Sequence, residues 1–442
     1  MQDYSYKNIW KVSYPVLLSL LAEHLISMTD TAFLGRVGEI ELGASAIGGV
    51  YFLAIYMLGF GFSLGSQIVI ARRNGEGKLN RIGAIFSQGI LFMLLLAVIL
   101  FTISKLFTSS LLDFAMQSEE VYHTTIQYLD WRLYGLFFAF TALMFRAFFI
   151  GTASTRILTI NAIVILLTNV GLNYILIFGK LGLPALGIKG AAIASSMAEA
   201  VSVMFYIMYS ASCIRWKIYG GLHFLYFNVR LLFQILKISV WMMLQSFLSV
   251  STWFIFFLMV ERLGERQLAI IQLVRNISSL PFLLISSFAT TCNALVSNAI
   301  GAGYKNEVWT ICMRVIKMVY VVVLPIILAV FLIPQWVLRI YTDNAELINS
   351  AIPTTKIMAS AFLITVPSVV LFNAVSGTGN TSKALLIEFT ILIVYILSVV
   401  YIVGYLRADV AVCWLTEHIY GLGLFTLCYW YMRKGHWQRK VI

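Results

Sequence analysis

The sequence has few charged residues for its length. Asp, Glu, Lys and Arg make up 11% of the 442 residues, whereas soluble globular proteins carry about 25%. Hydrophobic residues make up 60% of the chain, and the mean hydropathy is +0.90. A chain of this composition cannot keep most of its surface in water. It is therefore not an ordinary soluble protein, and lipid is its main solvent.

Cysteine and histidine are also scarce, with five residues of each. The cysteines lie far apart in the sequence, without a CxxC pair or a Cys/His spacing typical of metal ligands: Cys213, Cys292, Cys312, Cys413 and Cys428. This pattern predicts neither a disulfide framework nor a metal site. We expect all five cysteines to behave as small apolar residues.

Long apolar runs recur along the whole chain, for example at 82–106 and 385–404. Each is long enough to cross about 30 Å of hydrocarbon as a helix, and none alternates every second residue as a barrel strand would. We predict an all-α polytopic membrane protein with twelve transmembrane helices. They are expected at 12–34, 46–70, 83–107, 126–150, 157–179, 187–211, 236–260, 267–298, 307–333, 352–376, 383–404 and 409–431.

Basic residues are distributed by loop rather than gathered on one face. The formal net charge is +12, but a nucleic-acid interface needs basic residues clustered on a soluble surface, so we expect no nucleic-acid partner. Lys and Arg concentrate in alternate loops and in a basic tail that includes Arg433, Lys434 and Lys440. By the positive-inside rule, both termini are cytoplasmic.

An internal repeat appears when the chain is compared with itself at one fixed offset, the one that places Ser13 on Ser239. At this offset Gly38 falls on Gly264, Glu39 on Glu265, Gly75 on Gly301, Gly151 on Gly377 and Thr155 on Thr381. We predict an N-lobe of six helices at 1–213, a cytoplasmic linker at 214–231 and a C-lobe of six helices at 232–442. An even number of helices makes the repeats parallel, and such pseudo-symmetric lobes enclose a central cavity.

Asp30 is the sharpest candidate for function. It lies inside the first predicted helix, with no Lys or Arg within one helical turn. An ionisable group at the centre of a bilayer costs at least about 2.5 kcal/mol, so it marks a functional site by default. Glu23 lies two turns away on the same face, at about 10 Å. The two carboxylates could carry H⁺ or Na⁺; the alternative for either acid is a neutral form or a partner on a neighbouring helix.

Other polar and aromatic residues lie deep in predicted helices. Asn169 and Asn173 are four residues apart and share one helix face, where their oxygens could complete a cation site or simply join helices. Candidates to line a cavity for lipophilic organic cations are Gln67, Tyr56, Gln245, Trp253, Arg275, Asn293 and Asn373; packing is the alternative role for each. Glu199, Glu388, Glu417 and His418 are weaker candidates, because they could reach an interface or pair locally.

One motif is typical of an enzyme. Residues 61–65 spell GFSLG, which matches the GxSxG nucleophile elbow of hydrolases, but that motif requires a strand-turn-helix context and His and Asp partners. Here it lies inside a predicted membrane helix, where small residues allow close helix packing. We therefore expect no enzymatic activity, and a hydrolase that uses Ser63 is the alternative.

Three segments resemble one family of transporters. Pro15 followed by DTAFLGRVG at 30–38, the stretch NYILIFGKLGLPALGIKGAAIAS at 173–195 and VSNAIGAG at 296–303 are similar to motifs of the MATE (multidrug and toxic compound extrusion) family of the MOP superfamily. The resemblance covers nearly the whole chain. It implies a bacterial inner-membrane protein that exports organic compounds in exchange for H⁺ or Na⁺ by alternating access of two lobes.

The resemblance also implies roles for particular residues. Asp30 matches the aspartate that couples transport to the ion, and Asn169, Asn173 and Ser195 match further residues of a Na⁺ site in the N-lobe, in which a second carboxylate is missing here. Ser249 and Ser368 stand where other members carry acids, so no ion site is expected in the C-lobe. Because Ser249 is the repeat mate of Glu23, the acid could have moved to the other lobe.

The resemblance leaves one other transport function open. The same superfold includes flippases of lipid-linked precursors, whose anionic cargo would suit a cavity lined by Arg146 and Arg275, although Asp30 and Glu23 argue against it. For an exporter we expect small organic substrates, the lipid bilayer as surroundings and a monomer. Beyond the coupling H⁺ or Na⁺ we expect no cofactor, and no metal other than Na⁺ at Asp30.

Overall fold

The structure is a computed structural model that describes residues 4–115, 118–224, 227–261, 263–434 and 436–439. All regular elements in these ranges are helical. The α-helices are α1 (Tyr6–Leu34), α2 (Glu39–Gly75), α3 (Ile82–Ala115), α4 (Glu119–Arg132), α5 (Gly135–Gly151), α6 (Arg156–Phe178), α7 (Gly187–Cys213), α8 (Val229–Glu261), α9 (Glu265–Gly301), α10 (Glu307–Leu332), α11 (Pro334–Arg339), α12 (Ala345–Gly377), α13 (Thr381–Val399), α14 (Val410–Cys413) and α15 (Leu415–Lys434). Short 3-10 turns lie at Leu79–Arg81, Trp216–Tyr219 and His436–Arg439, and a π-helical turn extends α13 at Val400–Tyr405.

The prediction of a polytopic all-α protein is confirmed. Eleven helices among the described residues are long and apolar enough to cross a membrane, and the bent pair α4 and α5 raises the number to twelve if it forms one span. Predicted and observed helices agree in order. The structure extends several of them, since α2 and α9 each have 37 residues, more than the roughly 20 that a span requires. The predicted basic tail reaches Lys440, which lies outside the described residues.

The fourth predicted helix is not continuous. In place of one helix at 126–150, α4 and α5 meet at an angle of 49°. No proline lies at the bend; instead Arg132, the last residue of α4, forms an ion pair with Glu199 of α7. A Cβ atom on Gly135 would overlap the Arg132 guanidinium and would lie 2.5 Å from the Glu199 carboxylate. The glycine therefore leaves the space that this ion pair occupies at the bend.

Helix contacts divide the chain into two compact units. One comprises Leu18–Met243, and the other comprises Met1–Leu17 together with Leu244–Ile442. The division differs from the predicted lobes at 1–213 and 232–442, because the boundaries fall inside α1 and inside α8. The first turns of α1 thus group with the C-terminal helices, and the first half of α8 groups with the N-terminal helices.

The repeat is visible in the helix boundaries. The first and last residues of α2 are the repeat mates of the first and last residues of α9, and the last residue of α5 is the repeat mate of the last residue of α12. The same close approach occurs in each unit, because a Cβ on Gly151 would lie 3.2 Å from the carbonyl oxygen of Gln67, and one on Gly377 would lie 2.5 Å from that of Asn293. The two units therefore share a helix arrangement at these crossings.

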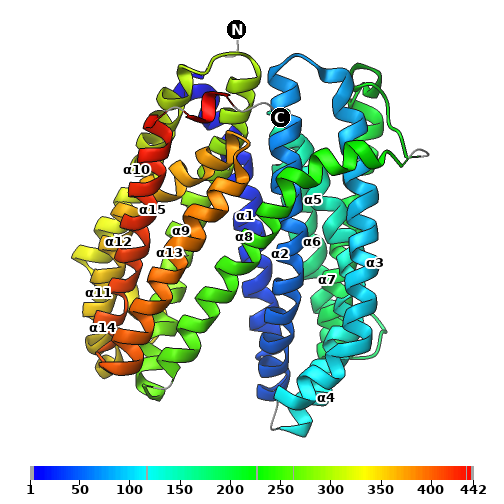
Figure 1. Cartoon of the computed structure of the whole chain (residues 1–442). Helices are drawn as coiled ribbons and strands as arrows, with labels where there is room; N and C mark the ends of the chain where they lie inside the picture. Colours follow the sequence, from blue (N-terminus) through cyan, green and yellow to red (C-terminus); the bar gives the residue numbers. More distant parts are fainter. Residues whose placement is uncertain (1–3, 116–117, 225–226, 262, 435, 440–442) are drawn as a thin grey trace. The chain divides into compact units, whose positions relative to one another are not determined.

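In the N-terminal unit, α2, α5, α6 and α7 run side by side, and α3 packs on α2 and α5 (Figure 1). Gly61 and Gly65 of α2 lie against the first half of α8, where their Cβ atoms would come within about 2.5 Å of Met243 and Ser239. Ser63 is buried and donates a hydrogen bond to the Phe60 carbonyl at 2.8 Å. The GxSxG segment thus forms a helix contact, as the packing interpretation predicted.

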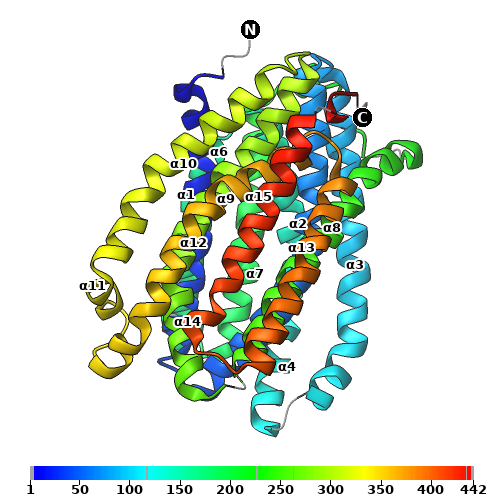
Figure 2. The same ribbon diagram turned by 60° about the vertical axis from the view of Figure 1, so that its left-hand side comes forward.

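In the C-terminal unit, α12 packs against both α9 and α15, and α13 lies beside α15 (Figure 2). One continuous hydrophobic core runs through these helices and includes Phe288, Val370 and Leu424. Tyr4, just before α1, and Ile9, near the start of α1, join this core, and Arg314 of α10 donates a hydrogen bond to the Tyr4 carbonyl at 2.8 Å. These contacts attach the amino terminus to the C-terminal unit.

Candidate cation site

Asp30 lies in α1 and faces α6 and α7 in the N-terminal unit. Its Oδ1 accepts a hydrogen bond from Asn173 Nδ2 at 2.5 Å, and its Oδ2 accepts one from Ser195 Oγ at 3.2 Å. Asn173 is fully buried, and Ser195 is 8% exposed. The structure therefore brings together the carboxylate predicted from the sequence and two of the residues implied by the resemblance. Both oxygens of Asp30 receive a donor, which suits the charged form.

Asn169 completes the network. Its Nδ2 donates to Ser195 Oγ at 3.2 Å, and its Oδ1 accepts from Asn173 Nδ2 at 3.0 Å. Asn169 and Asn173 share one face of α6 because they are one helical turn apart, as predicted. Asn173 Oδ1 is buried without a hydrogen-bond partner among the described residues. An oxygen without a donor beside a carboxylate is a suitable ligand for a hard cation.

The site contains oxygen ligands from three helices. Asp30, Asn169, Asn173 and Ser195 offer two carboxylate oxygens, two amide oxygens and one hydroxyl. Such a set can hold a proton on the carboxylate, or Na⁺ if the Asn173 amide turns its oxygen toward Asp30. A nearby ion pair joins Arg132 of α4 to Glu199 at 2.7 Å, and the Arg132 guanidinium lies 3.7 Å from the centre of the Phe52 ring. The guanidinium is thus already engaged by Glu199 and Phe52.

Glu23 lies apart from this network. It forms an ion pair with Arg146 of α5 at 2.8 Å, and its side chain is 46% exposed whereas that of Arg146 is 10% exposed. No hydrogen bond joins Glu23 to Asp30 in the described part of the chain. The partner on a neighbouring helix, one of the alternatives for Glu23, is what the structure contains. The same pair neutralises Arg146, one of the two arginines considered for an anionic cargo.

The residues expected to line a cavity fall into separate places. In the N-terminal unit, Gln67 is 2% exposed in the packed part of α2, and Tyr56 stacks between Phe52 and Phe60 with ring centres 6.4 Å apart in each case. Tyr56 therefore belongs to an aromatic row along α2, and Gln67 belongs to the helix core.

The remaining cavity candidates lie in the C-terminal unit. Trp253 is 42% exposed, and the Arg275 guanidinium lies 5.9 Å from its ring centre. Asn293 is fully buried where α9 meets α12. Asn373 donates to the Val369 carbonyl of its own helix at 3.0 Å. Gln245 of α8 is 9% exposed. Among these candidates, the structure brings together Trp253 and Arg275.

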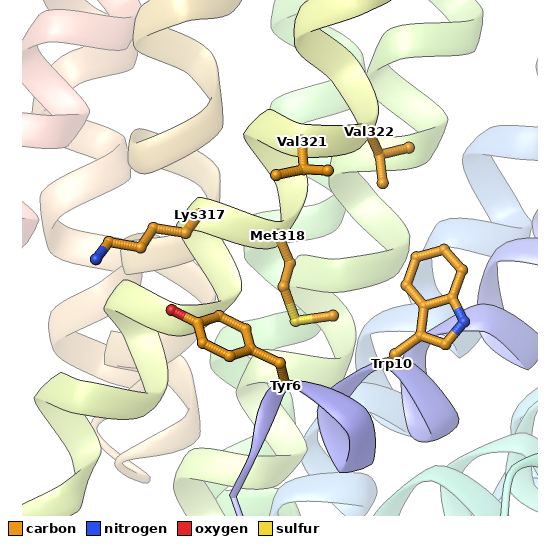
Figure 3. Close-up of a pocket in the computed structure, with 6 residues that line it drawn as sticks. All are labelled: Tyr6, Trp10, Lys317, Met318, Val321 and Val322. Atoms are coloured by element: carbon orange, nitrogen blue, oxygen red, sulfur yellow. The ribbon is translucent and has the colours of Figure 1, made fainter.

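An open pocket of about 380 Å³ lies between the first turns of α1 and the middle of α10. Figure 3 shows Tyr6 and Trp10 on one side of it and Met318, Val321 and Val322 on the other, with Lys317 at the edge. None of these lining residues was a predicted site residue. The pocket walls are apolar, so this pocket is not the polar site that the sequence predicted.

Two acids that were weaker candidates in the sequence, Glu199 and Glu388, have side-chain hydrogen-bond partners in the structure. Both lie inside their units: Glu199 is bound by Arg132, and Glu388 by Ser249 and Tyr420. Ser368, for which the resemblance implies an acid in other family members, donates to the Gly421 carbonyl at 2.8 Å. For both acids, the only signal in the sequence is an acidic residue inside an apolar run.

Comparison with known proteins decides the family. The family model described as MatE matches residues 15–175 and again residues 242–402. The chain belongs to the MatE family. The first match begins in α1 and the second begins in α8, so each covers one half of the internal repeat. The resemblance recognised in the sequence is thereby confirmed.

Other MatE members are similar over most of this chain. A probable multidrug resistance protein NorM of Idiomarina loihiensis is 26% identical over 90% of this chain and 86% of its own length. A protein of the same description from Thermotoga maritima is 23% identical, over 99% of this chain and 94% of its own length. These identities are low, but the matches extend across both halves of the repeat.

Solved structures share the fold. A multidrug resistance MATE family transporter of the MOP superfamily in an outward-facing conformation superposes with a TM-score of 0.89 at 18% identity, over 99% of this chain and 97% of that one. A MOP superfamily transporter from Pyrococcus furiosus gives a TM-score of 0.88 at 19% identity with the same coverage. The MatE fold therefore extends over the whole chain.

Proposed function

We propose that this protein is a secondary active multidrug exporter that couples efflux of cationic or lipophilic organic compounds to entry of H⁺ or Na⁺. The observation that carries the proposal is the Asp30 network, in which one intramembrane carboxylate is held by side chains of α6 and α7. The names of the NorM relatives support the substrate class. We place the protein in the bacterial inner membrane, with both termini cytoplasmic, and as a monomer.

In the proposed mechanism, Asp30 alternates between a charged state and a state that carries the cation. A bound cation removes the charge that Asn173 and Ser195 otherwise satisfy, so their hydrogen bonds must rearrange. Rearranged donors on α6 and α7 change the relative stability of inward-open and outward-open forms. A population shift of this kind requires only a few kcal/mol of differential binding. The same carboxylate, when free of its ion, attracts a cationic drug.

The test measures dye transport by inverted membrane vesicles under imposed pH or Na⁺ gradients in turn. In such vesicles, export from the cytoplasmic face moves dye into the lumen. We expect one gradient to drive efflux in the wild type, and the Asp30→Asn variant to lose that response because an amide carries no charge to neutralise. Asp130→Asn is the matched control, since Asp130 is a half-exposed aspartate paired with Lys105. Retained coupling in Asp30→Asn would refute the proposal. A wild type that moves no dye under either gradient would also refute it and would favour the flippase alternative.

A further inference from the structure

A second buried carboxylate lies in the C-terminal unit, where the proposed mechanism uses none. Glu388 of α13 is 2% exposed. The position that the repeat assigns to Asp30 in this unit is residue 256, a phenylalanine that is 1% exposed in the core. Glu388 therefore cannot be explained as the repeat copy of Asp30. A carboxylate buried this deeply is costly unless it is paired or neutral.

The hydrogen bonds of Glu388 are one-sided. Ser249 Oγ donates to Oε1 at 2.5 Å, and Tyr420 OH donates to the same oxygen at 3.3 Å. The other oxygen, Oε2, is buried without a hydrogen-bond partner among the described residues. If Glu388 were charged in this arrangement, Oε2 would hold part of the negative charge with no donor. The geometry fits a carboxylic acid whose proton is on Oε2.

A matching acceptor lies on the same face of α8 as Ser249. Gln245 is one helical turn before Ser249, and the Ser249 hydroxyl also contacts the Gln245 backbone carbonyl at 2.9 Å. The side-chain oxygen of Gln245, Oε1, is buried and has no donor in the described part of the chain. Glu388 Oε2 and Gln245 Oε1 are thus two buried oxygens without a donor that both belong to residues bonded to Ser249, and a proton on Glu388 would add a donor to this region.

Glu388 has no ion-pair partner in the described part of the chain. No Lys, Arg or His among the described residues forms an ion pair with it. On α13 and the adjacent α15, Tyr420 and Cys428 are the titratable groups that interact with Glu388, and Tyr395 and Glu417 adjoin Tyr420. Tyr395 donates to Glu417 at 2.9 Å and packs against Tyr420, and His418 contacts Ser360 of α12 at 2.9 Å. Glu388 and Glu417 are thus the two acids of this region, and only Glu388 has a buried oxygen without a donor among the residues described.

We propose that Glu388 is a second proton-binding site, at which Oε2 takes up one proton and releases it again during transport. Ser249 and Tyr420 hold Oε1 in both states, and Gln245 accepts the hydrogen bond when the proton is present. Proton binding at Glu388 does not depend on the proposed function. Its use in transport does, because it adds one proton to each cycle of the exporter.

Infrared difference spectra of the purified protein between acidic and alkaline buffer test the binding directly. We expect a carbonyl-stretch band of a protonated carboxylic acid that is lost in Glu388→Gln and retained in Asp30→Asn. Glu417→Gln is the matched control, because Glu417 also accepts a hydrogen bond from a tyrosine, and its spectrum should keep the band. A Glu388→Gln spectrum identical to that of the wild type, or loss of the band in Glu417→Gln, would overturn the proposal.

A second variant, which keeps the acid, tests the proposal even if Glu388→Gln does not fold. Ser249→Ala keeps the acid but removes one donor to its carbonyl oxygen, so the band should persist and move to higher wavenumber. An unchanged band in Ser249→Ala would show that the titrating acid is not Glu388, and would also overturn the proposal.

Transport then separates this site from the one at Asp30. With a pH gradient of one unit, loss of one coupled proton lowers the steady-state dye accumulation ratio about tenfold. We expect that decrease in Glu388→Gln, with efflux retained, whereas Asp30→Asn should abolish efflux. If accumulation is unchanged in Glu388→Gln, the coupling role is refuted. If Asp30→Asn still transports while the infrared band behaves as expected, the proposed function fails and proton binding at Glu388 survives.

Discussion

Asn173 connects the carboxylate of Asp30 to α6. Its contribution to ion-coupled efflux can be separated from the contribution that any buried asparagine makes to stability. We expect Asn173→Ala to reduce gradient-driven efflux strongly, because Asp30 loses its closest donor and the site loses an amide oxygen. The loss of one buried hydrogen bond should lower the free energy of unfolding by about 1 kcal/mol. Efflux rate and thermal unfolding in detergent measure the two effects.

Asn161 is the control on the same helix. It is 7% exposed and exchanges hydrogen bonds with Ser202 of α7 at 2.8 and 3.0 Å, so it joins the same two helices away from Asp30. Asn161→Ala should be destabilised to a similar extent and should keep its response to the gradient. Equal losses of efflux in both variants would mean that Asn173 is merely part of the packing.

The Glu23 and Arg146 ion pair allows a test of whether Glu23 carries an ion. Glu23→Gln leaves the Arg146 guanidinium, 10% exposed, without its partner, and we expect the fraction of folded protein and the efflux rate to fall together. The double variant Glu23→Gln with Arg146→Gln should recover folding and efflux, because both charges of the pair are then absent. Efflux that stays lost in a well-folded double variant would assign Glu23 a coupling role.

At the scale of residues, two properties of the sequence predicted candidate site residues: helical periodicity and the cost of a charge inside the membrane. Asp30 was identified by its apolar surroundings, and Asn169 and Asn173 by their spacing along one helix face. Ser195 was implied only by the family resemblance, since nothing local distinguishes it from other serines. The partners of Glu199 and Glu388 could not be predicted, because Arg132 and Ser249 are 67 and 139 residues away along the chain.

At the scale of elements, the glycines of α2 allow a prediction about helix packing. A Cβ at residue 61 would lie 2.5 Å from the backbone of Met242 and Met243 in α8, and a backbone cannot move aside as a flexible side chain can. We expect Gly61→Ala to lower the free energy of unfolding by about 1–3 kcal/mol. Thermal unfolding in detergent measures this effect.

Gly49 of the same helix has no atom within 4 Å of its Cβ position. Gly49→Ala should leave stability unchanged or raise it by up to about 1 kcal/mol, because alanine favours a helix. A Gly61→Ala protein as stable as Gly49→Ala would show that α2 and α8 do not approach as closely as described.

The bend between α4 and α5 is a feature that the hydrophobic pattern of the sequence does not predict. Its apolar run from 126 to 150 is long enough for one span, and it contains no proline that would signal a break. The bend coincides with the ion pair between Arg132 and Glu199, for which Gly135 leaves room. A contact between residues so far apart in the sequence cannot be read from a local pattern, whereas the other long apolar helices follow from theirs; the short α11 and the break between α14 and α15 were not predicted.

At the scale of the whole molecule, the two halves of the repeat share helix bounds but differ in their intramembrane acids. The bounds of α2 and α9 are repeat mates of each other, and the sequence revealed this correspondence through glycines and small residues. The acids inside the first membrane helix do not repeat: Phe256 stands at the place of Asp30, and Ser249 stands at the place of Glu23. Helix packing could therefore be predicted from one half to the other, but the second carboxylate of the C-terminal unit could not.

The predicted orientation of the chain in the membrane can be tested with a native cysteine. Cys213, at the end of α7, is exposed, and the other four cysteines are buried. If the termini are cytoplasmic, Cys213 lies on the cytoplasmic side, so a membrane-impermeant maleimide should label one site in inverted vesicles and none in intact cells, as read by mass spectrometry. Cys213→Ser should abolish the labelling. Labelling of Cys213 in intact cells would reverse the topology, because one helix end fixes the side of every loop.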